Sequence, residues 1–153
     1  MTEKNAFGDN VIVQVAVAVP DIESTAKHLA DIFGMEVPKI YDMSVNIDKY
    51  KGKITDSYVK TCYFPMGQVD LELIQPVGDD IAAGEFLRRN SGPGIQHIAF
   101  MVDNIEEKCK YLEKKGLDVV QVTKFSDGTA AFIRIPEMGA DIELLEGSSK
   151  PKK

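Results

Sequence analysis

Four polar side chains in this sequence have the chemical types that hold a divalent metal ion. They are an amide, an imidazole and two carboxylates: Gln14, His97, Glu72 and Glu143. The carboxylates offer negative charge to a cation, and the set leaves coordination positions open for substrate or water. Because no thiolate is among them, a tetrahedral structural zinc site is not expected.

These four residues fall at equivalent places in a duplicated pattern. QVAVAVPDIESTAKHLADIFGMEV, which starts at Gln14, matches HIAFMVDNIEEKCKYLEKKGLDVV, which starts at His97, and FPMGQVDLELIQP matches IPEMGADIELLEG. Each copy reads as a strand and then a helix, with Asp21 and Asn104 at the N-cap positions. Two further strands precede a last strand that carries the glutamate. We predict these strands at MEVPKIY and DSYVKTCYF in the first copy and at LDVVQVT and TAAFIRI in the second.

The sequence therefore predicts two βαβββ modules, at about 10–77 and 94–147. A short helix and connector, DDIAAGEFLRRNSG, joins them. Together the modules form one domain over residues 10–147, and the polar tail 148–153 is expected to be disordered.

Alternation along the strands decides which side chains meet, because successive residues face opposite sides of a sheet. In the first strand the valines are expected under the helix, and the other face carries a glutamine and two alanines that would line a hollow: Val13, Val15, Val17, Val19; Gln14, Ala16, Ala18. The same parity puts Glu72, His97 and Glu143 on the hollow side. A lone strand glutamate is usually just solvated. The hypothesis of a site rests on all four occurring together and converging across a pseudo-twofold axis.

Composition excludes several classes of function. The chain has 153 residues and a net charge of −6, which argues against a nucleic-acid partner. No apolar run is long enough to span a bilayer, and MTEKNAFGDN has no secretory signal pattern. Cys62 and Cys109 are interpreted as buried free thiols rather than a disulfide or a nucleophile. A cytoplasmic protein with no membrane partner is the expectation.

At this point the residues carry a resemblance to a family. The pieces VQVAVAVPDIESTAKHLADIFGMEV, VDLELIQPVG, GPGIQHIAFMVDNIEE and DIELLE resemble the vicinal oxygen chelate (glyoxalase/bleomycin resistance/dioxygenase) superfamily. The resemblance implies an α+β fold in which two βαβββ modules form a curved mixed sheet around a cavity. It also implies metal ligands at Gln14, Glu72, His97 and Glu143, and a divalent ion such as Co, Ni, Mn, Zn or Mg.

Within that superfamily, the segment from VKTCYFPMGQVDLELIQPVG to GIQHIAF resembles the methylmalonyl-CoA epimerase family. Gln14 departs from the histidine usual in epimerases, and IPEMGADIELL lacks their His-Pro-Lys. The ligand set itself resembles glyoxalase I, the lactoylglutathione lyase. Both families remove a proton α to a thioester or hemithioacetal carbon. The resemblance implies Glu143 as the base, with Glu72 as the symmetric alternative.

Two other readings are weighed against these. An iron-dependent dioxygenase of this fold needs two histidines, and His28, on a predicted helix surface, cannot supply the second. A metal-free binding module would keep the hollow but has no need of the ligands. The expected partners are a small thioester or hemithioacetal and a second copy of the chain in a homodimer. Whether the site lies in one chain or across a dimer stays open. SVNIDKYKGKITDSY and Arg88-Arg89 are interpreted as a solvated loop and helix face near its mouth.

Overall fold

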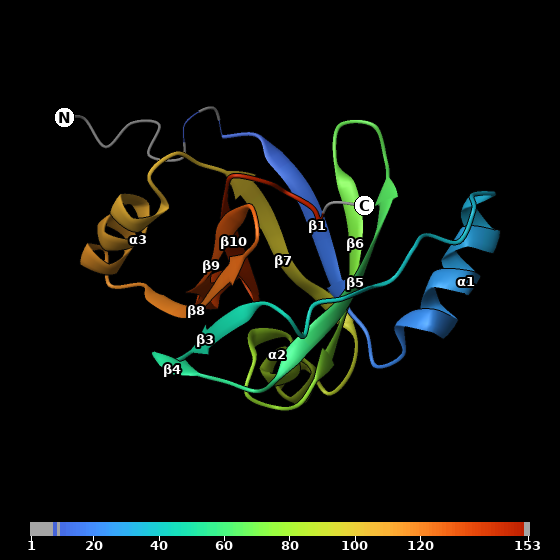
Figure 1. Ribbon diagram of the computed structural model, residues 1–153, viewed down its shortest axis with the longest axis horizontal. Helices are drawn as coiled ribbons and strands as arrows, with labels where there is room; N and C mark the ends of the chain where they lie inside the picture. The colour runs from blue at the N-terminus through green and yellow to red at the C-terminus, as the bar shows by residue number, and fades with distance from the viewer. Residues whose placement is uncertain (1–7, 9, 152–153) are drawn as a thin grey trace.

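The computed structural model describes Gly8 and residues 10–151; the N-terminal segment and the last two residues of the predicted tail lie outside that range. The described residues form one mixed sheet and three α-helices (Figure 1). In chain order the elements are β1 Ile12–Ala18, α1 Ile22–Phe33, β2 Tyr41–Asp42, β3 Ile47–Tyr50, β4 Lys53–Ile54, β5 Tyr58–Pro65, β6 Asp70–Val77, α2 Ala82–Asn90, β7 Gly94–Met101, α3 Ile105–Lys114, β8 Asp118–Phe125, β9 Gly128–Ile135, a 3-10 turn Pro136–Met138 and β10 Ala140–Glu146.

Strand order shows how the two modules join. The ten-stranded sheet of the described chain runs β2-β5-β6-β1-β7-β10-β9-β8-β3-β4. β1 and β7, the first strands of the two modules, pair antiparallel at the centre, and each pairs parallel with its module's last strand, β6 or β10. The sheet curls into a half-barrel, so the predicted α+β fold with a curved mixed sheet is confirmed.

Each module buries its helix against its own strands. α1 packs through Ile22, Ala26 and Ala30 on Leu73 and Phe64, and α3 packs on the opposite flank of the molecule (Figure 1). Asp21 caps α1 by accepting a hydrogen bond from the Ser24 amide at 3.1 Å, as predicted. Both helices lie on the convex side of the sheet, which leaves the concave side free to line a cavity.

Asn104 is the N-cap residue of α3, as predicted, but the hydrogen bonding at this helix start differs from that of α1. Asn104 has a left-handed backbone, with φ of 54°, and its side chain makes no capping hydrogen bond. The Ile105 amide instead donates to Glu146 Oε1 at 3.3 Å. A side chain distant in sequence therefore satisfies this helix end, which local spacing could not predict.

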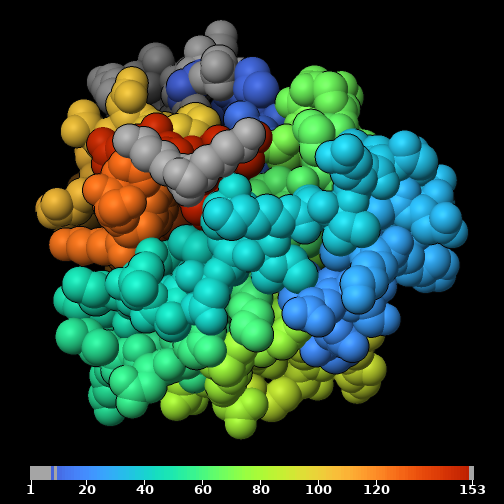
Figure 2. Space-filling view, turned by 45° about the vertical axis from the view of Figure 1, so that its right-hand side comes forward, coloured from blue at the N-terminus to red at the C-terminus, as the bar shows by residue number. Residues whose placement is uncertain are grey.

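The connection from α1 to β5 also differs from the prediction. The strand expected over MEVPKIY is reduced to β2, and SVNIDKYKGKITDSY is not a plain solvated loop but contains the β3–β4 hairpin. β3 leaves its own module and pairs antiparallel with β8 of the other. In the space-filling view this cyan and teal connection spreads across the front of the molecule, toward the orange strands of the second module (Figure 2).

Strand parity holds along most of the central pair. Val17 packs toward α1, and Ala16 and Ala18 are fully buried. The two alanines do not line the cavity as predicted, because Ala18 packs on Phe86 of α2 and only Gln14 of the three is among the lining residues. Val13 is the exception, because the β1–β7 register shifts between Ile12 and Gln14 and Val13 packs beside Ala99 and Leu145 instead of under the helix. Among the described residues, no helix is long and apolar enough to cross a membrane.

Candidate metal centre

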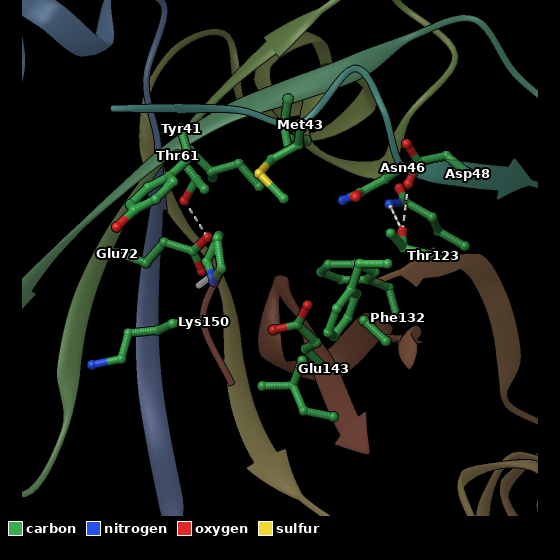
Figure 3. A pocket seen from close by; sticks show the side chains of 18 of the residues that line it. Tyr41, Met43, Asn46, Asp48, Thr61, Glu72, Thr123, Phe132, Glu143 and Lys150 are labelled. Atoms are coloured by element: carbon green, nitrogen blue, oxygen red, sulfur yellow. Dashed lines mark hydrogen bonds between the residues drawn. The ribbon is translucent and has the colours of Figure 1, made fainter. Parts of the chain in front are cut away.

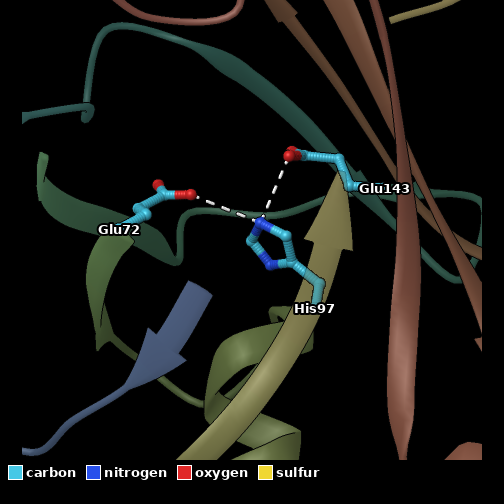
Figure 4. A group of neighbouring side chains, drawn as sticks. All are labelled: Glu72, His97 and Glu143. Atoms are coloured by element: carbon cyan, nitrogen blue, oxygen red, sulfur yellow. Dashed lines mark ion pairs between the residues drawn. The ribbon is translucent and has the colours of Figure 1, made fainter. Parts of the chain in front are cut away.

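Three of the four predicted residues form a tight buried cluster (Figure 4). His97 Nε2 lies 3.3 Å from Glu72 Oε1 and 3.2 Å from Glu143 Oε1. The three ligand atoms all fall within 4.8 Å of one another. His97 is 1% exposed, Glu72 6% and Glu143 7%, so the two carboxylates meet the imidazole with little solvent between them.

Register on four neighbouring strands brings these side chains together. Ala16 of β1 is paired with Glu72 on β6 and with His97 on β7. Ala99 of β7 is paired with Gln14 on β1 and with Glu143 on β10. The small alanines leave room above the sheet. Ala16 lies between Glu72 and His97 as Ala99 lies between Gln14 and Glu143, which is the pseudo-twofold relation expected from the repeat.

Gln14 lines the same cavity as the cluster and is 1% exposed. Its side-chain Nε2 donates a hydrogen bond to the Ser149 carbonyl at 2.5 Å. Lys150 also pairs with Asp70 at 3.0 Å, so residues 149–150 lie against the sheet, which differs from the disordered tail expected from residue 148. The structure thus brings all four predicted residues to one cavity, with Gln14 held by the tail.

The cavity above the cluster has a volume of about 650 Å³. Tyr41, Met43 and Asn46 from the α1–β5 connection lie across the cavity from Glu143 (Figure 3). Residues 81–83 at the start of α2 also line it. Arg88, which the sequence places near the mouth, pairs with Asp79 instead and is not among the lining residues.

Burial and charge shift the pKa values in the cluster. Burial alone would lower the pKa of His97, but the adjacent Glu143 and Glu72 carboxylates outweigh it and raise that pKa to about 10. Burial raises the pKa of Glu143, and the Glu72 charge adds to that rise against the opposing effect of His97. Thr61 Oγ1 lies 2.5 Å from Glu72 Oε2 and orients that carboxylate. A cluster with two buried carboxylates therefore needs a positive charge, from a proton or a cation.

The donor set fits a divalent metal ion. His97 Nε2 is a buried nitrogen with no hydrogen-bond partner among the described residues, although both carboxylates face it. An imidazole nitrogen, two carboxylates and an amide are ligands that Mn, Co, Ni and Zn all accept. Such an ion would satisfy the unpaired nitrogen and the negative charge together.

Sequence reasoning missed a row of polar residues behind His97. His97 Nδ1 lies 2.5 Å from Gln96 Oε1, and Gln96 Nε2 lies 2.9 Å from Asp141 Oδ2. Arg134 bridges Asp141 and Glu85. Burial raises the pKa of Asp141 against the effect of the arginine. Asp141 lies two residues before Glu143 on the same face of β10, so strand alternation could have indicated it. Gln96 lies beside His97 because of a register shift between β1 and β7, which alternation does not predict.

The remaining expectations on side chains can be checked directly. Cys62 is buried and Cys109 partly buried, and both are free thiols, as predicted. His28 is exposed on α1 and does not line the cavity that contains His97. It therefore cannot serve as the second histidine that an iron-dependent dioxygenase requires. Burial raises the pKa of both thiols to about 11, so neither has the character of a nucleophile.

Fold and cluster agree with a comparison to known families. The profile of the Glyoxalase/Bleomycin resistance protein/Dioxygenase superfamily matches residues 13–133, and the chain belongs to this superfamily. Its relatives include methylmalonyl-CoA epimerases. The mitochondrial methylmalonyl-CoA epimerase of Mus musculus is 30% identical over 101 residues, which is 66% of this chain and 51% of that protein. The match thus spans about half the length of that relative.

A solved structure and a second relative extend the comparison. The crystal structure of methylmalonyl-CoA epimerase from Mycobacterium tuberculosis has the same fold, with a TM-score of 0.64 at 22% identity over 90% of this chain and 88% of that chain. The lactoylglutathione lyase of Schizosaccharomyces pombe is 40% identical over 89 residues, which cover 54% of this chain and 28% of that protein. Both enzyme classes that the sequence resembles are thus represented among its relatives.

Proposed function

We propose that this chain is a divalent-metal-dependent epimerase acting on methylmalonyl-CoA or a similar acyl-CoA. The observation that carries the proposal is the pair of buried carboxylates, Glu72 and Glu143, each facing His97 Nε2 from its own module (Figure 4). Epimerisation at carbon requires a proton to leave one face and another to arrive at the opposite face, which two flanking carboxylates can serve. The epimerases among the relatives support an acyl-CoA substrate.

Gln14, Glu72, His97 and Glu143 would hold the metal ion. When bound, the ion would supply positive charge against the negative charge that develops on the thioester oxygen as the α-proton is removed. His97 would contribute a neutral nitrogen, and the two carboxylates would balance the charge of the ion. The choice among Co, Ni, Mn, Zn and Mg is left to metal analysis.

Glu143 is proposed as the base that takes the α-proton. Its burial raises its pKa, and a more basic carboxylate is a better acceptor for a weakly acidic carbon. Glu72, oriented by Thr61, would return a proton from the other side. The cavity wall beside them carries Phe132 and Ile74, apolar surfaces that suit the methyl group of the substrate and exclude water.

A side-by-side assay tests this function. Protein loaded with each metal is given methylmalonyl-CoA in deuterated water, and deuterium entry at C2 is followed together with inversion. The same samples are given the methylglyoxal–glutathione hemithioacetal, and thioester formation is followed. We expect exchange at C2 with the acyl-CoA. Activity with the hemithioacetal alone would overturn the epimerase assignment.

The second candidate is a glyoxalase I-type isomerase of a hemithioacetal. Gln14 at the first ligand position and the identity to a lactoylglutathione lyase favour it. The chemistry needs the same cluster, because a proton again leaves a carbon next to a charge-stabilised oxygen. The hemithioacetal arm of the assay distinguishes it.

A metal-free binding module is the non-enzymatic alternative. It would use the cavity without the cluster. Metal analysis of the purified protein, with titration of nickel, cobalt, manganese and zinc, separates it from both enzymes. Stoichiometric binding that is lost in Glu72→Gln supports the metal centre, and failure of every ion to bind leaves only the cavity.

A further inference from the structure

A continuous row of polar contacts leads away from the metal-facing side of His97. It runs from His97 Nδ1 to Gln96 Oε1 (2.5 Å), from Gln96 Nε2 to Asp141 Oδ2 (2.9 Å), from Asp141 Oδ1 to Arg134 Nε (2.9 Å) and from Arg134 to Glu85 Oε1 (2.7 Å). Gln96 and Asp141 are fully buried. Buried polar rows of this kind are costly unless every member is satisfied.

The direction of each hydrogen bond in this row follows from its outer end. Arg134 can only donate, so Asp141 Oδ1 accepts. A carboxylate accepts at both oxygens, so Gln96 must turn its NH2 group to Asp141 and its oxygen to His97. His97 Nδ1 must then carry a hydrogen. In the neutral ring, which is the form that binds a metal ion, the lone pair is therefore at Nε2, which faces Glu72 and Glu143.

We propose that Gln96 and Asp141 are positioning residues that fix the tautomer and orientation of His97, so that Nε2 is presented to the metal ion. This inference rests on the proposed metal centre but concerns residues outside its ligand set. Partners behind a metal-binding histidine fix its ring in this way in many proteins.

An irregularity in the backbone of β7 places the Gln96 side chain beside the His97 ring. The β1–β7 register shifts next to Gln96, so Gln96 and His97, adjacent in sequence, both line the cavity. Asp141 lies directly beside His97 in the β7–β10 register. The bulge brings the amide level with the ring, which strict alternation would have turned to the other face.

Asp141→Asn is the decisive variant because it keeps the shape and reverses one hydrogen bond. Its oxygen would still accept from Arg134, so its NH2 group would face Gln96. Gln96 would have to flip and offer its own NH2 group to His97 Nδ1, which can then only accept. The ring hydrogen would move to Nε2, the nitrogen that the metal needs unprotonated.

Ring nitrogen NMR reads this directly. The chain contains two histidines, and His28, exposed on α1, serves as an internal reference in protein labelled with ¹⁵N-histidine. Because the neighbouring carboxylates raise the pKa of His97 to about 10, both ring nitrogens carry hydrogens at neutral pH, and the signals are therefore followed to a pH above 10, where the ring is neutral. In the neutral ring of the metal-free wild type we expect a protonated, pyrrole-type Nδ1 in His97. In the neutral ring of Asp141→Asn we expect an unprotonated, pyridine-type Nδ1. In competition titrations zinc should bind this variant about 10- to 100-fold more weakly than the wild type.

A double variant supplies the rescue. Gln96→Glu combined with Asp141→Asn restores a consistent row, because the new amide can donate to the new carboxylate and that carboxylate accepts from Nδ1. Protonated Nδ1 and most of the zinc affinity should return. The matched control is Gln121→Leu, a buried glutamine that lines the same cavity and bonds Ala82 and Thr123 instead; its His97 signals should match the wild type.

The outcomes separate this inference from the proposed function. In the neutral ring, an unprotonated Nδ1 in the wild type, a protonated Nδ1 in Asp141→Asn, or no recovery in the double variant would overturn the positioning role. If the nitrogen signals switch and recover as expected but the wild type binds no zinc, nickel, cobalt or manganese, the metal centre is wrong, while the control of the His97 tautomer stands.

Discussion

Two carboxylates and one imidazole, from Glu72, Glu143 and His97, lie in a space from which water is largely excluded. Two buried carboxylates without a counter-charge are strongly unfavourable, since burial disfavours each anion and each anion disfavours the other. The raised pKa of His97, about 10, is the response of the metal-free protein: the ring keeps a proton that neutralises part of this charge. A divalent ion can take over that role and leave the ring neutral.

Replacing either glutamate by glutamine tests whether both Glu72 and Glu143 are needed as acid and base. Glu143→Gln and Glu72→Gln keep the size of the side chain but remove its ability to accept a proton and its negative charge as a metal ligand. We expect turnover to fall on the order of 10²- to 10⁴-fold for each, measured as deuterium exchange at C2 of methylmalonyl-CoA with metal content determined on the same samples. Exposed Glu137→Gln is the control. A variant that retains its metal and its activity loses its place as acid or base.

Thr61→Val tests the orientation of Glu72 without touching the cluster itself. The hydroxyl lies 2.5 Å from Glu72 Oε2, and valine has nearly the same shape without the donor. We expect metal affinity to fall by about tenfold, because a ligating carboxylate that loses its hydrogen bond is less well oriented. Affinity is measured by competition with a chelating dye. An unchanged affinity would assign Thr61 to packing alone.

At the scale of elements, most of the strands and the convergence of the site residues were predicted from the duplicated pattern and from strand alternation. Both depend on interactions between residues close in sequence, such as the alternation around Leu71 and Leu73 that turns Glu72 away from the core. Since the two copies share one pattern, equivalent positions had to be related by the same symmetry. The meeting of Glu72, His97 and Glu143 could therefore be predicted without a structure.

The parts that were not predicted depend on contacts between distant segments. The β3–β4 hairpin finds its partner, β8, in the other module, where Thr123 Oγ1 donates a hydrogen bond to Asp48 at 2.5 Å, a contact between residues 75 positions apart that local patterns do not predict. The register shifts beside Val13 and Gln96 arise where β1 and β7 meet in a twisted sheet. Gln96 could therefore not be recognised as a neighbour of the His97 ring from alternation alone.

The junction between the hairpin and α2 predicts a dependence of stability on pH. Burial alone would raise the pKa of Glu85, but hydrogen bonds from Tyr50, Lys51 and Arg134 lower it to about 2. A lowered pKa stabilises the fold above the ordinary value of 4.5, and this contribution is lost as the pH falls from there toward 2.

Glu85→Gln should remove that contribution. We expect the free energy of unfolding to fall by about 1 kcal/mol at neutral pH, a modest figure because solvent screens part of the interaction, and the loss should shrink between pH 4.5 and 2. Urea denaturation at several pH values measures it, with exposed Glu36→Gln as the control. A difference between variant and wild type that stays constant with pH would contradict the assignment.

At the scale of the whole molecule, the site joins the two modules within one chain. Glu72 comes from β6 of the first module, while His97 and Glu143 come from β7 and β10 of the second. The central β1–β7 pair holds these strands in one continuous sheet. Assembly into a homodimer stays a prediction, and an exchange of modules between two chains would place Glu72 and Glu143 of one site on different chains.

Co-expression of two inactive variants decides between these arrangements. If each site lies in one chain, a mixture of Glu72→Gln and Glu143→Gln contains no intact site, and we expect activity no higher than that of the separate variants. If modules are exchanged in a dimer, the mixed dimer regains one complete site, and activity would rise to about a quarter of the wild type, since half of the dimers are mixed and each has one good site of two. Differently tagged chains, purified through both tags, confirm that mixed dimers have formed. Recovered turnover in that doubly purified fraction would refute a site built within a single chain.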